Sequence, residues 1–380
     1  PAATLHEDAP VYDRPRRRPE GQDALVDDEP PTAIGDAGRE LLHLLRDPSW
    51  VYRQYDHQLF LNTVEGPGGD AALLRLRGPG VRPSEPGRVP AIALSTDGNA
   101  RWCALDPRHG TALTVAESAL NVACVGAQPV ALVNCLNFGN PEHPEVMWQL
   151  SEAIDGMAEA CRALEIPVIG GNVSLYNESR GRDIDPTPVV GTLGLVEHLE
   201  RRPPGLVLRD GDDIVLVQAP GTRPALGGSS WAAEIHDHRG GSLAGVDWAA
   251  HRALLDLVRD LAGAGRVSGI HDVSGGGLAV ALAEMAVASG VGFRVEMDLS
   301  ASGLFGEAPS RVLVSVAPAL MGDVVQAAAA AGLEASTIGT AGGARLVVGT
   351  VMDLALAEAT RWWRDALPGA LALTPGGSQV

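Results

Sequence analysis

Small polar side chains follow a glycine pair in residues 167–177, which read PVIGGNVSLYN. A short apolar run ends at Gly170 and Gly171, and Asn172 and Ser174 come directly after it. A buried strand that ends at glycines brings backbone N–H groups close to a ligand. These groups suit an oxyanion such as phosphate, and the Asn and Ser oxygens suit a metal or ligand contact. For an isolated glycine pair, a strand-end bulge is the favoured interpretation, and two glycosylation sequons overlap this stretch.

Three further polar clusters lie beside predicted strands of the same region. Residues 66–70 (GPGGD) precede a strand, residues 95–99 (STDGN) follow one, and residues 134–141 (NCLNFGNP) follow a third. Ligands of α/β domains gather where strand ends converge. Four such clusters therefore predict a shared ligand better than four unrelated turns. None matches G-x-G-x-x-G between a strand and a helix, which disfavours a dinucleotide site.

A second glycine-rich stretch, residues 269–277 (GIHDVSGGG), runs from a predicted strand into a predicted helix. Glycines before a helix N-terminus can hold an anion. His271 and Asp272 are adjacent, and neighbours in a strand point to opposite faces, so a catalytic dyad is not favoured. We expect Asp272 or Ser274 to cap the helix instead. No G-x-S-x-G elbow stands between a strand and a helix, so a hydrolase triad is unsupported.

The composition limits the chemistry further. All 29 basic residues are Arg, and the formal net charge is −18. The absence of Lys excludes a P-loop lysine and a Schiff-base lysine, so a site for ATP must use Mg²⁺, Arg and backbone donors. The negative charge disfavours a nucleic-acid partner.

The four cysteines form no C-x-x-C pair, so we expect free thiols and a reducing, cytoplasmic compartment. This expectation weakens the sequon interpretation. No apolar run reaches about 18 residues, so no membrane span is predicted.

The elements that position these clusters form two α/β segments. We predict a linker over 1–48, a first domain over 49–202, a second over 203–368 and a tail over 369–380, which is disordered from residue 374. A capping box at Thr114 predicts one helix that ends at Gly126, and Pro144 begins the next. The other predicted helices cover 251–261, 278–289, 320–331 and 354–367. The predicted strands cover 71–76, 91–95, 130–133, 167–169, 189–196, 213–217, 291–297, 311–316 and 345–348.

Taken in order, these clusters closely resemble the synthetase subunit of phosphoribosylformylglycinamidine synthase, small type. The resemblance extends over nearly the whole chain, and CLNFGNP with GGNVSLYNE is its most specific part. It implies a mixed α/β (α+β) fold like that of aminoimidazole ribonucleotide synthetase, with an ATP-binding-type N-terminal domain and a C-terminal domain. The family's subunit is about twice this length, a tandem duplication, and this chain resembles the second half alone. We therefore expect the family's catalytic His, and most of its substrate contacts, to lie in the missing N-terminal half.

The resemblance also implies roles for individual residues. Gly171 is expected to contact the nucleotide through its backbone, Asn172 to bind Mg²⁺ and Ser174 to bind the formylglycinamide ribotide. Asn134 stands where the family commonly has an ATP-contacting Asp, so a nucleotide contact is expected there without a metal. Gly275 replaces the Asp of the family's HDVSDGG, which weakens the case for a second nucleotide at that loop. No catalytic residue is expected in this half.

The implied activity is an ATP-dependent amidoligase that converts the ribotide's amide to an amidine in purine biosynthesis. Expected partners are the missing N-terminal half, a glutaminase subunit that supplies ammonia and a small bridging subunit. Two alternatives remain open: a non-catalytic half that scaffolds the pseudo-dimer, and a stand-alone kinase or synthetase of the same superfamily. Because Pro1 is not an initiator Met, we also expect a processed or truncated chain.

Overall fold

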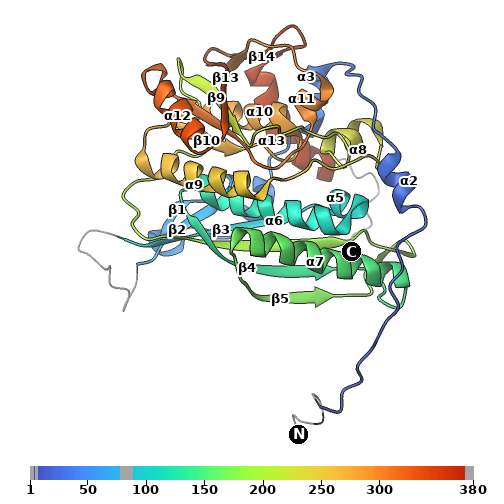
Figure 1. The fold of residues 1–380 in the computed structure, drawn as a ribbon. Helices are drawn as coiled ribbons and strands as arrows, with labels where there is room; N and C mark the ends of the chain where they lie inside the picture. Colours follow the sequence, from blue (N-terminus) through green and yellow to red (C-terminus); the bar gives the residue numbers. More distant parts are fainter. Residues whose placement is uncertain (1–3, 5–6, 78–88, 373–380) are drawn as a thin grey trace.

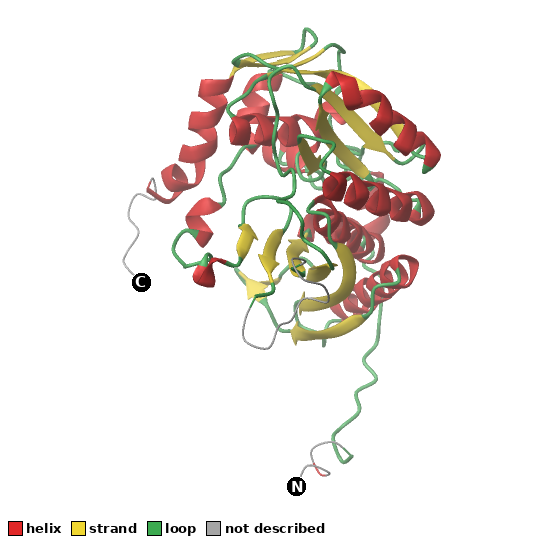
Figure 2. Ribbon diagram, turned by 90° about the vertical axis from the view of Figure 1, so that its left-hand side faces the viewer, coloured by secondary structure: helices red, strands yellow, loops and turns green. Residues whose placement is uncertain are grey.

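Two β-sheets, each with its own helices, make up the computed structural model, which describes residue 4, residues 7–77 and residues 89–372. Figure 1 shows the first sheet below, helices α6 and α7 above it, and the second domain at the top. The turned view in Figure 2 shows helices beside one side of the first sheet. This arrangement is the mixed α/β architecture that the sequence predicts.

The first sheet has the strand order β1-β2-β3-β8-β4-β5, so β5 is an edge strand. Strands β4 and β5 are parallel, and β8 is antiparallel to both of its neighbours, β3 and β4. The carboxyl ends of β3, β4 and β5 therefore lie at the same end of the sheet. The strands are β1 (Thr63–Glu65), β2 (Ala72–Arg75), β3 (Ala91–Gly98), β4 (Gln128–Asn137), β5 (Val168–Ser174) and β8 (Thr187–Val196), with a small hairpin of β6 (Glu178–Ser179) and β7 (Arg182–Asp183).

Three helices belong to this sheet: α5 (Ala100–Leu105), α6 (Pro107–Cys124) and α7 (Pro144–Leu164). The predicted start of α7 at Pro144 is confirmed. The capping box at Thr114 is wrong, because α6 begins seven residues earlier, where the Asp106 carboxylate accepts a hydrogen bond from the His109 N–H at 2.9 Å. Thr114 lies inside the helix and donates to the Gly110 carbonyl at 2.9 Å. Gly110 weakens the helix prediction for this stretch, because glycine is unfavourable inside a helix. It is nevertheless required there, since a Cβ would lie 2.5 Å from the Trp102 backbone.

The second sheet has seven strands in the order β10-β12-β9-β13-β11-β14-β15. The strands predicted over Arg311–Val316 and Arg345–Val348 are confirmed, whereas residues 352–355 form a strand and not the start of the last helix. The strands are β9 (Asp213–Gln218), β10 (Gly269–Asp272), β11 (Phe293–Val295), β12 (Arg311–Val316), β13 (Glu334–Ala341), β14 (Arg345–Val348) and β15 (Met352–Ala355). The helices are α8 (Ser230–His236), α9 (Trp248–Ala264), α10 (Gly277–Ser289), α11 (Ala301–Phe305), α12 (Pro318–Ala330) and α13 (Leu356–Ala372).

The N-terminal segment carries α2 (Gln22–Asp27), α3 (Ala37–Leu44), α4 (Ser49–Tyr52) and the 3₁₀ turn η1 (Leu59–Leu61). Its arginines form ion pairs: Arg17 donates to Glu145 of α7, and Arg18 pairs with Asp23. Helix α3 lies within the segment predicted as a linker, yet its leucines are buried in the core of the second domain. The residues of the predicted tail from 373 onward lie outside the described part of the chain.

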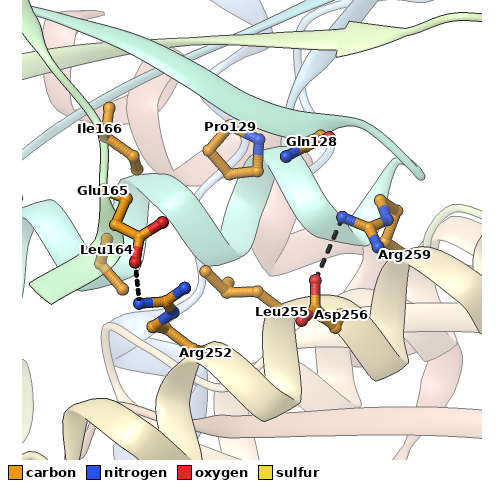
Figure 3. A pocket seen from close by; sticks show the side chains of 9 residues that line it. All are labelled: Gln128, Pro129, Leu164, Glu165, Ile166, Arg252, Leu255, Asp256 and Arg259. Atoms are coloured by element: carbon orange, nitrogen blue, oxygen red, sulfur yellow. Dashed lines mark hydrogen bonds and ion pairs between the residues drawn. The ribbon is translucent and has the colours of Figure 1, made fainter.

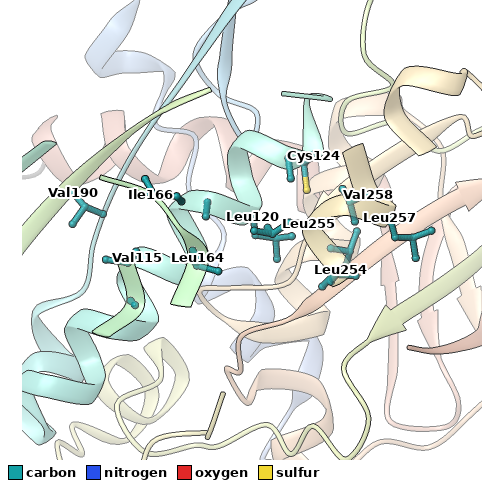
Figure 4. Close-up of a cluster of buried hydrophobic side chains, with 14 of the residues drawn as sticks. Val115, Leu120, Cys124, Leu164, Ile166, Val190, Leu254, Leu255, Leu257 and Val258 are labelled. Carbon is teal, nitrogen blue, oxygen red and sulfur yellow. The ribbon is translucent and has the colours of Figure 1, made fainter. Parts of the chain in front are cut away.

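One hydrophobic core joins the two domains. Figure 4 shows side chains of α6 and of the α7 end facing those of α9, and Leu120 and Leu254 belong to the same buried cluster. Valines of β12 extend this cluster into the second sheet. Burial of this apolar surface fixes how the domains meet. No helix in the described part of the chain is long and apolar enough to cross a membrane.

Candidate functional site

The glycine pair lies inside β5 and does not end it. Residues 170–174 continue the strand and pair with β4, and a register irregularity skips Ile169. The expected strand end at the glycine pair is therefore wrong, and the irregularity lies one residue before the pair, inside the strand. Because β5 is at the sheet edge, one side of its backbone has no neighbouring strand among the described residues. Backbone donors near the pair are thus open to a ligand.

The four expected site residues lie on two faces of this edge. Asn134 pairs with Gly171, while Asn172 pairs with Cys135 and Ser174 with Asn137. Asn134 faces the helices, since its amide nitrogen lies 3.4 Å from the Met157 sulfur of α7. Strand alternation places Asn172 and Ser174 on the opposite, open face.

Gly171 has a packing reason to be glycine. A Cβ at this position would lie 2.2 Å from the Asn134 side-chain oxygen, closer than any real contact allows. The Asn134 amide is held against α7, so it has little room to move. Gly170, in contrast, would meet nothing within 4 Å. The surrounding atoms therefore require glycine at position 171 but not at position 170.

The open face of the sheet is apolar beside these amides. Leu94, Val133 and Leu195 are 44%, 43% and 37% exposed, respectively. These side chains come from β3, β4 and β8, which are neighbours in the order β3-β8-β4, and their registers place them on one face of the sheet. We call these three residues the open apolar face.

The loops that close this end of the sheet are cross-linked. The Asn177 amide donates to the Phe138 carbonyl at 3.1 Å and to the Ser174 carbonyl at 3.0 Å. Nδ1 of His143 lies 2.6 Å from Oδ2 of Asp183, whose other oxygen accepts the Asn140 N–H at 2.7 Å. These bonds hold the CLNFGNP loop against the end of β5.

The four polar clusters do not meet at one ligand. Residues of the first two, Gly68–Asp70 and Thr96–Asp97, line a cavity of about 400 Å³ between the domains. None of the four expected site residues lines it. The sequence predicted one meeting point for all four clusters. The structure instead brings the first two together at the interdomain cavity and the other two together at the edge of the first sheet.

The interdomain cavity is acidic and draws on distant parts of the chain. The first domain contributes Asp70, Asp97 and, from α6, Glu117 and Asn121. Their i, i+4 spacing puts the last two on one helix face. The second domain contributes His271, Asp272, Ser274 and Glu284, and Tyr52 and Trp363 stand among the lining residues.

His271 bonds carboxylates from both domains. Its Nδ1 lies 2.6 Å from Asp70 Oδ1 and its Nε2 lies 3.1 Å from Glu284 Oε2. Asp272 Oδ1 is 3.5 Å from the same Nδ1, so the expectation that the two neighbours diverge is wrong. Asp272 is the last residue of β10, where strand alternation no longer separates the side chains. One ligand atom from each of Asp70, His271 and Asp272 lies within 4.8 Å of the others.

Burial and like charges perturb this cluster. Burial raises the pKa of Asp272 to about 8, and Asp70 adds to the rise. Burial raises the pKa of Glu117 well above its usual value, and Asp97 and Asp272 raise it further. Burial by itself lowers the pKa of His271, but Asp70 and Glu284 outweigh it, so the net pKa is raised well above the usual value. Protons bound to these groups therefore reduce the net negative charge of the cluster.

One polar atom among the residues that line the cavity lacks a hydrogen-bond partner. Asn121 donates its amide N–H to Asp97 Oδ1 at 2.9 Å, but its own side-chain oxygen is buried without a hydrogen bond. An orphaned buried oxygen carries a desolvation cost. Asn121 and the carboxylates offer oxygen donors of the kind that Mg²⁺ and Ca²⁺ prefer, and His271 adds one nitrogen.

The expected helix cap in the glycine-rich loop is also wrong. The N-cap of α10 is Gly276, with φ of 78° and no side-chain cap of its own. Ser274 and Asp272 line the cavity instead. The carboxylate of Glu307, 3% exposed, accepts the Gly276 N–H at 2.8 Å.

A smaller pocket of about 150 Å³ lies between the end of α7 and α9 (Figure 3). Both of its arginines are paired. Arg252 donates to Glu165 at 2.7 Å and Arg259 pairs with Asp256 at 3.1 Å. The neutralised charges leave this pocket without a preference for an anion.

Comparison with known proteins relates the chain to one family. Residues 68–196 match the AIR synthase related protein N-terminal domain, and residues 209–351 match the C-terminal domain of the same family. The phosphoribosylformylglycinamidine synthase subunit PurL of Moorella thermoacetica is 44% identical over 98% of this chain and 51% of its own length. The corresponding subunit of Thermobifida fusca is 41% identical over 92% of this chain and 46% of its own.

Solved structures share the fold. Thermotoga maritima PurL complexed with FGAR matches 87% of this chain and 54% of its own, with a TM-score of 0.67 and 15% identity. The same protein complexed with ATP covers 88% and 45%, with a TM-score of 0.54 and 22% identity. The PurLQS structure from that organism covers 88% and 45%, with a TM-score of 0.55 and 22% identity.

The chain spans about half the length of the curated relatives that it matches. Within that half, both family domains occur in order; the first covers strands β2 to β8 and the second covers strands β9 to β14. The chain therefore belongs to the AIR synthase related family and is homologous to about half of the PurL subunit of phosphoribosylformylglycinamidine synthase.

Proposed function

We propose that this chain is the second half of a PurL-type synthetase and supplies one wall of its ATP, Mg²⁺ and ribotide site. The observation that carries the proposal is the pair Asn172, which is exposed, and Ser174, which is half-buried, on an edge strand beside the open apolar face. A site made of an edge and an uncovered sheet face needs a second body to enclose it. The half-length match to PurL supports the missing N-terminal half as that body.

Each residue of the edge takes one role in this proposal. Backbone donors at Gly171 contact the nucleotide, and Asn134 contacts it from the helix side of the sheet. Ser174, fixed by Asn177, hydrogen-bonds the ribotide. No acid or base role is proposed for any of these groups.

Mg²⁺ fits Asn172 as one ligand among several. The side-chain oxygen of Asn172 is neutral and hard, and the Cys135 sulfur at 4.0 Å is a weak partner that leaves it available. Phosphate oxygens and groups of the missing half would complete the shell. When bound, Mg²⁺ would neutralise charge on the transferred phosphate, which this chain cannot do with lysine.

The proposed reaction converts formylglycinamide ribonucleotide to the amidine with ATP and ammonia. The amide oxygen attacks the γ-phosphate with release of ADP, and ammonia then displaces phosphate from the activated carbon. This chain contributes positioning and preorganised donors. A glutaminase subunit is proposed to supply the ammonia and a small bridging subunit to complete the assembly, in line with the PurLQS structure of the relative.

Reconstitution tests this function. The chain is mixed with a PurL fragment that covers the other half, and turnover is measured with ATP, Mg²⁺, the ribotide and ammonia. We expect turnover only with both parts, and Asn172→Ala to reduce it strongly. Asn62→Ala, a half-buried amide of the same domain that bonds the Arg77 carbonyl, is the control and should leave turnover unchanged.

The outcomes separate the alternatives. Turnover by the chain alone would favour a stand-alone kinase or synthetase. Full activity of Asn172→Ala would contradict the metal role. If Ser174→Ala changes stability but not rate, and calorimetry shows no response to nucleotide, the chain is a scaffold half.

A second binding function is favoured by the orphaned Asn121 oxygen. We infer that the interdomain cavity holds a divalent cation between Asp70, Asp97, Glu117 and Asp272. Mn²⁺ titration followed by electron paramagnetic resonance tests this inference. Asp97→Asn should weaken binding, whereas Asp256→Asn, an exposed carboxylate on α9, should not. Equal affinity of both variants and the parent would contradict the inference.

A further inference from the structure

Glu307 is a buried carboxylate at the domain seam, and none of the roles described above uses it. It lies between α11 and β12 and is 3% exposed. Its backbone pairs with Ala225, with N–H to carbonyl distances of 2.9 Å and 3.0 Å in the two directions. This bridge fixes the direction in which the side chain leaves the main chain.

All three groups that bond the carboxylate are donors. Oε1 accepts the N–H of Gly276 and of Ser230, each at 2.8 Å. Oε2 accepts the indole N–H of Trp102 at 3.0 Å. A carboxylate accepts from several donors at once and is the acceptor that best satisfies such a set.

The carboxylate stands where an anion would bind. Gly276 is the N-cap of α10, and a negative charge at a helix N-terminus is stabilised by the helix dipole. The glycine-rich loop that the sequence suggested as an anion site is therefore filled by the protein's own Glu307. A Cβ at Gly277 would lie 2.7 Å from the Phe305 backbone, so the loop also packs closely against the segment that carries Glu307.

The third donor ties this loop to the other domain. Trp102 belongs to α5 of the first domain. Its neighbour Arg101 donates to the Gly228 carbonyl at 3.1 Å and to the Ser230 hydroxyl at 2.9 Å. One carboxylate thus fastens the start of α8, the start of α10 and the first domain at a single point.

We propose that Glu307 is the positioning residue of the interdomain cavity. It holds the segment 272–276 against the first domain, so that Asp272 and Ser274 face Asp70, Asp97 and Glu117. This inference rests on the proposed divalent-cation site in the cavity. Glu307 acts through Asp272 and Ser274 and does not touch the cation itself.

Mn²⁺ affinity of the full chain is the first readout. Glu307→Gln keeps the size of the side chain but directs an NH₂ group at one of the three donors. We expect it to weaken Mn²⁺ binding by about tenfold or more, as loss of an outer-shell partner does. Trp102→Phe removes a single donor and should weaken binding less. A folded Glu307→Gln variant with parental Mn²⁺ affinity would overturn the proposal.

Rescue by a small carboxylate is the second readout. Glu307→Ala leaves a space beside three unsatisfied donors, so acetate should restore its Mn²⁺ affinity, and Tris chloride at the same ionic strength should not. Restoration by both salts would contradict the proposal. A variant that only lost stability would regain no affinity from acetate.

Hydrogen exchange separates this proposal from the cation site. If the parent chain binds no Mn²⁺, the cation site is wrong, and Glu307 is then judged by the Gly276 and Ser230 amides alone. Faster exchange of both amides in Glu307→Gln supports its positioning role. Unchanged exchange overturns it.

Discussion

Two histidine–carboxylate pairs have the same separation in very different surroundings. His143 and Asp183 lie 2.6 Å apart beside the edge site, with side chains 56% and 29% exposed. His271 and Asp70 are also 2.6 Å apart in the interdomain cavity, with side chains 9% and 2% exposed. Water screens the first pair, whereas the second must be satisfied by the protein alone.

The difference extends to the two regions as wholes. The edge site offers neutral amides, free backbone and an uncovered apolar face, so it is built to be completed by another body. The cavity is lined by both domains of this chain and gathers carboxylates whose like charges are offset by protons, by His271 or by a cation. The edge site is thus incomplete in this chain, whereas the cavity is formed by residues of this chain.

The largest expected loss of stability comes from a change in the buried pair of His271 and Asp70. Asp70→Asn removes the charge that balances His271 and should lower the free energy of unfolding by about 3–5 kcal/mol in metal-free buffer. Asp183→Asn, the matched exposed change, should cost less than about 1 kcal/mol. Urea unfolding measures both. Equal costs would mean that burial does not distinguish the two pairs.

The pH dependence of the cavity comes next. The folded pKa of His271 is raised above its unfolded value of about 6.5, so its contribution is full below that pH and is lost as the pH rises through the folded pKa. Asp272 has the same sign, because its pKa rises to about 8 on folding. With EDTA present, the free energy of unfolding should therefore fall as the pH rises from about 4, the unfolded pKa of an Asp, through about 8, and the contribution of His271 extends the fall above about pH 6.5. His271→Gln should flatten this slope, and an unchanged slope would contradict the assignment.

At the edge site the expected effect is smaller and steric. Gly171→Ala places a methyl group against the Asn134 amide and should cost about 1–3 kcal/mol by overpacking. Gly170→Ala has open space around it and is the control. Adding Asn134→Ala to Gly171→Ala should recover part of the loss, because the Asn134 backbone carbonyl would still lie 2.9 Å from the new Cβ. Failure of this double variant to recover stability would place the strain elsewhere.

The smallest effect on stability is expected on the open apolar face. Leu94→Thr should change the free energy of unfolding of the isolated chain by no more than about 0.5 kcal/mol, since Leu94 is already 44% exposed. The same change should weaken association with the other half of the synthetase, measured by sedimentation. A large loss of stability without any change in association would show that this face is not a docking surface.

Short sequence patterns predicted those helices and strands whose start or type depends on a few neighbouring residues. Pro144 marked the start of α7, and continuous valines marked β12, because capping and apolar runs act within a few residues. The start of α6 was missed although Asp106 caps it and Pro107 is its first residue, because Gly110 interrupts the helix pattern and serves a contact with Trp102. Strand β13, with its small polar residues, carried no strand signal and is formed by pairing with β9 and β11.

The sequence by itself determined the family, the order of the two domains, the absence of lysine chemistry and the polar clusters that could bind a ligand. Only the tertiary structure decided that these clusters separate into two places. Asp70 and His271 are 201 residues apart in the chain, and Trp102 and Glu307 are 205 apart. Contacts over such separations depend on how α6, α7 and α9 bury their shared core. No spacing along the chain encodes that packing, so the cavity and its Glu307 support become visible only in the folded molecule.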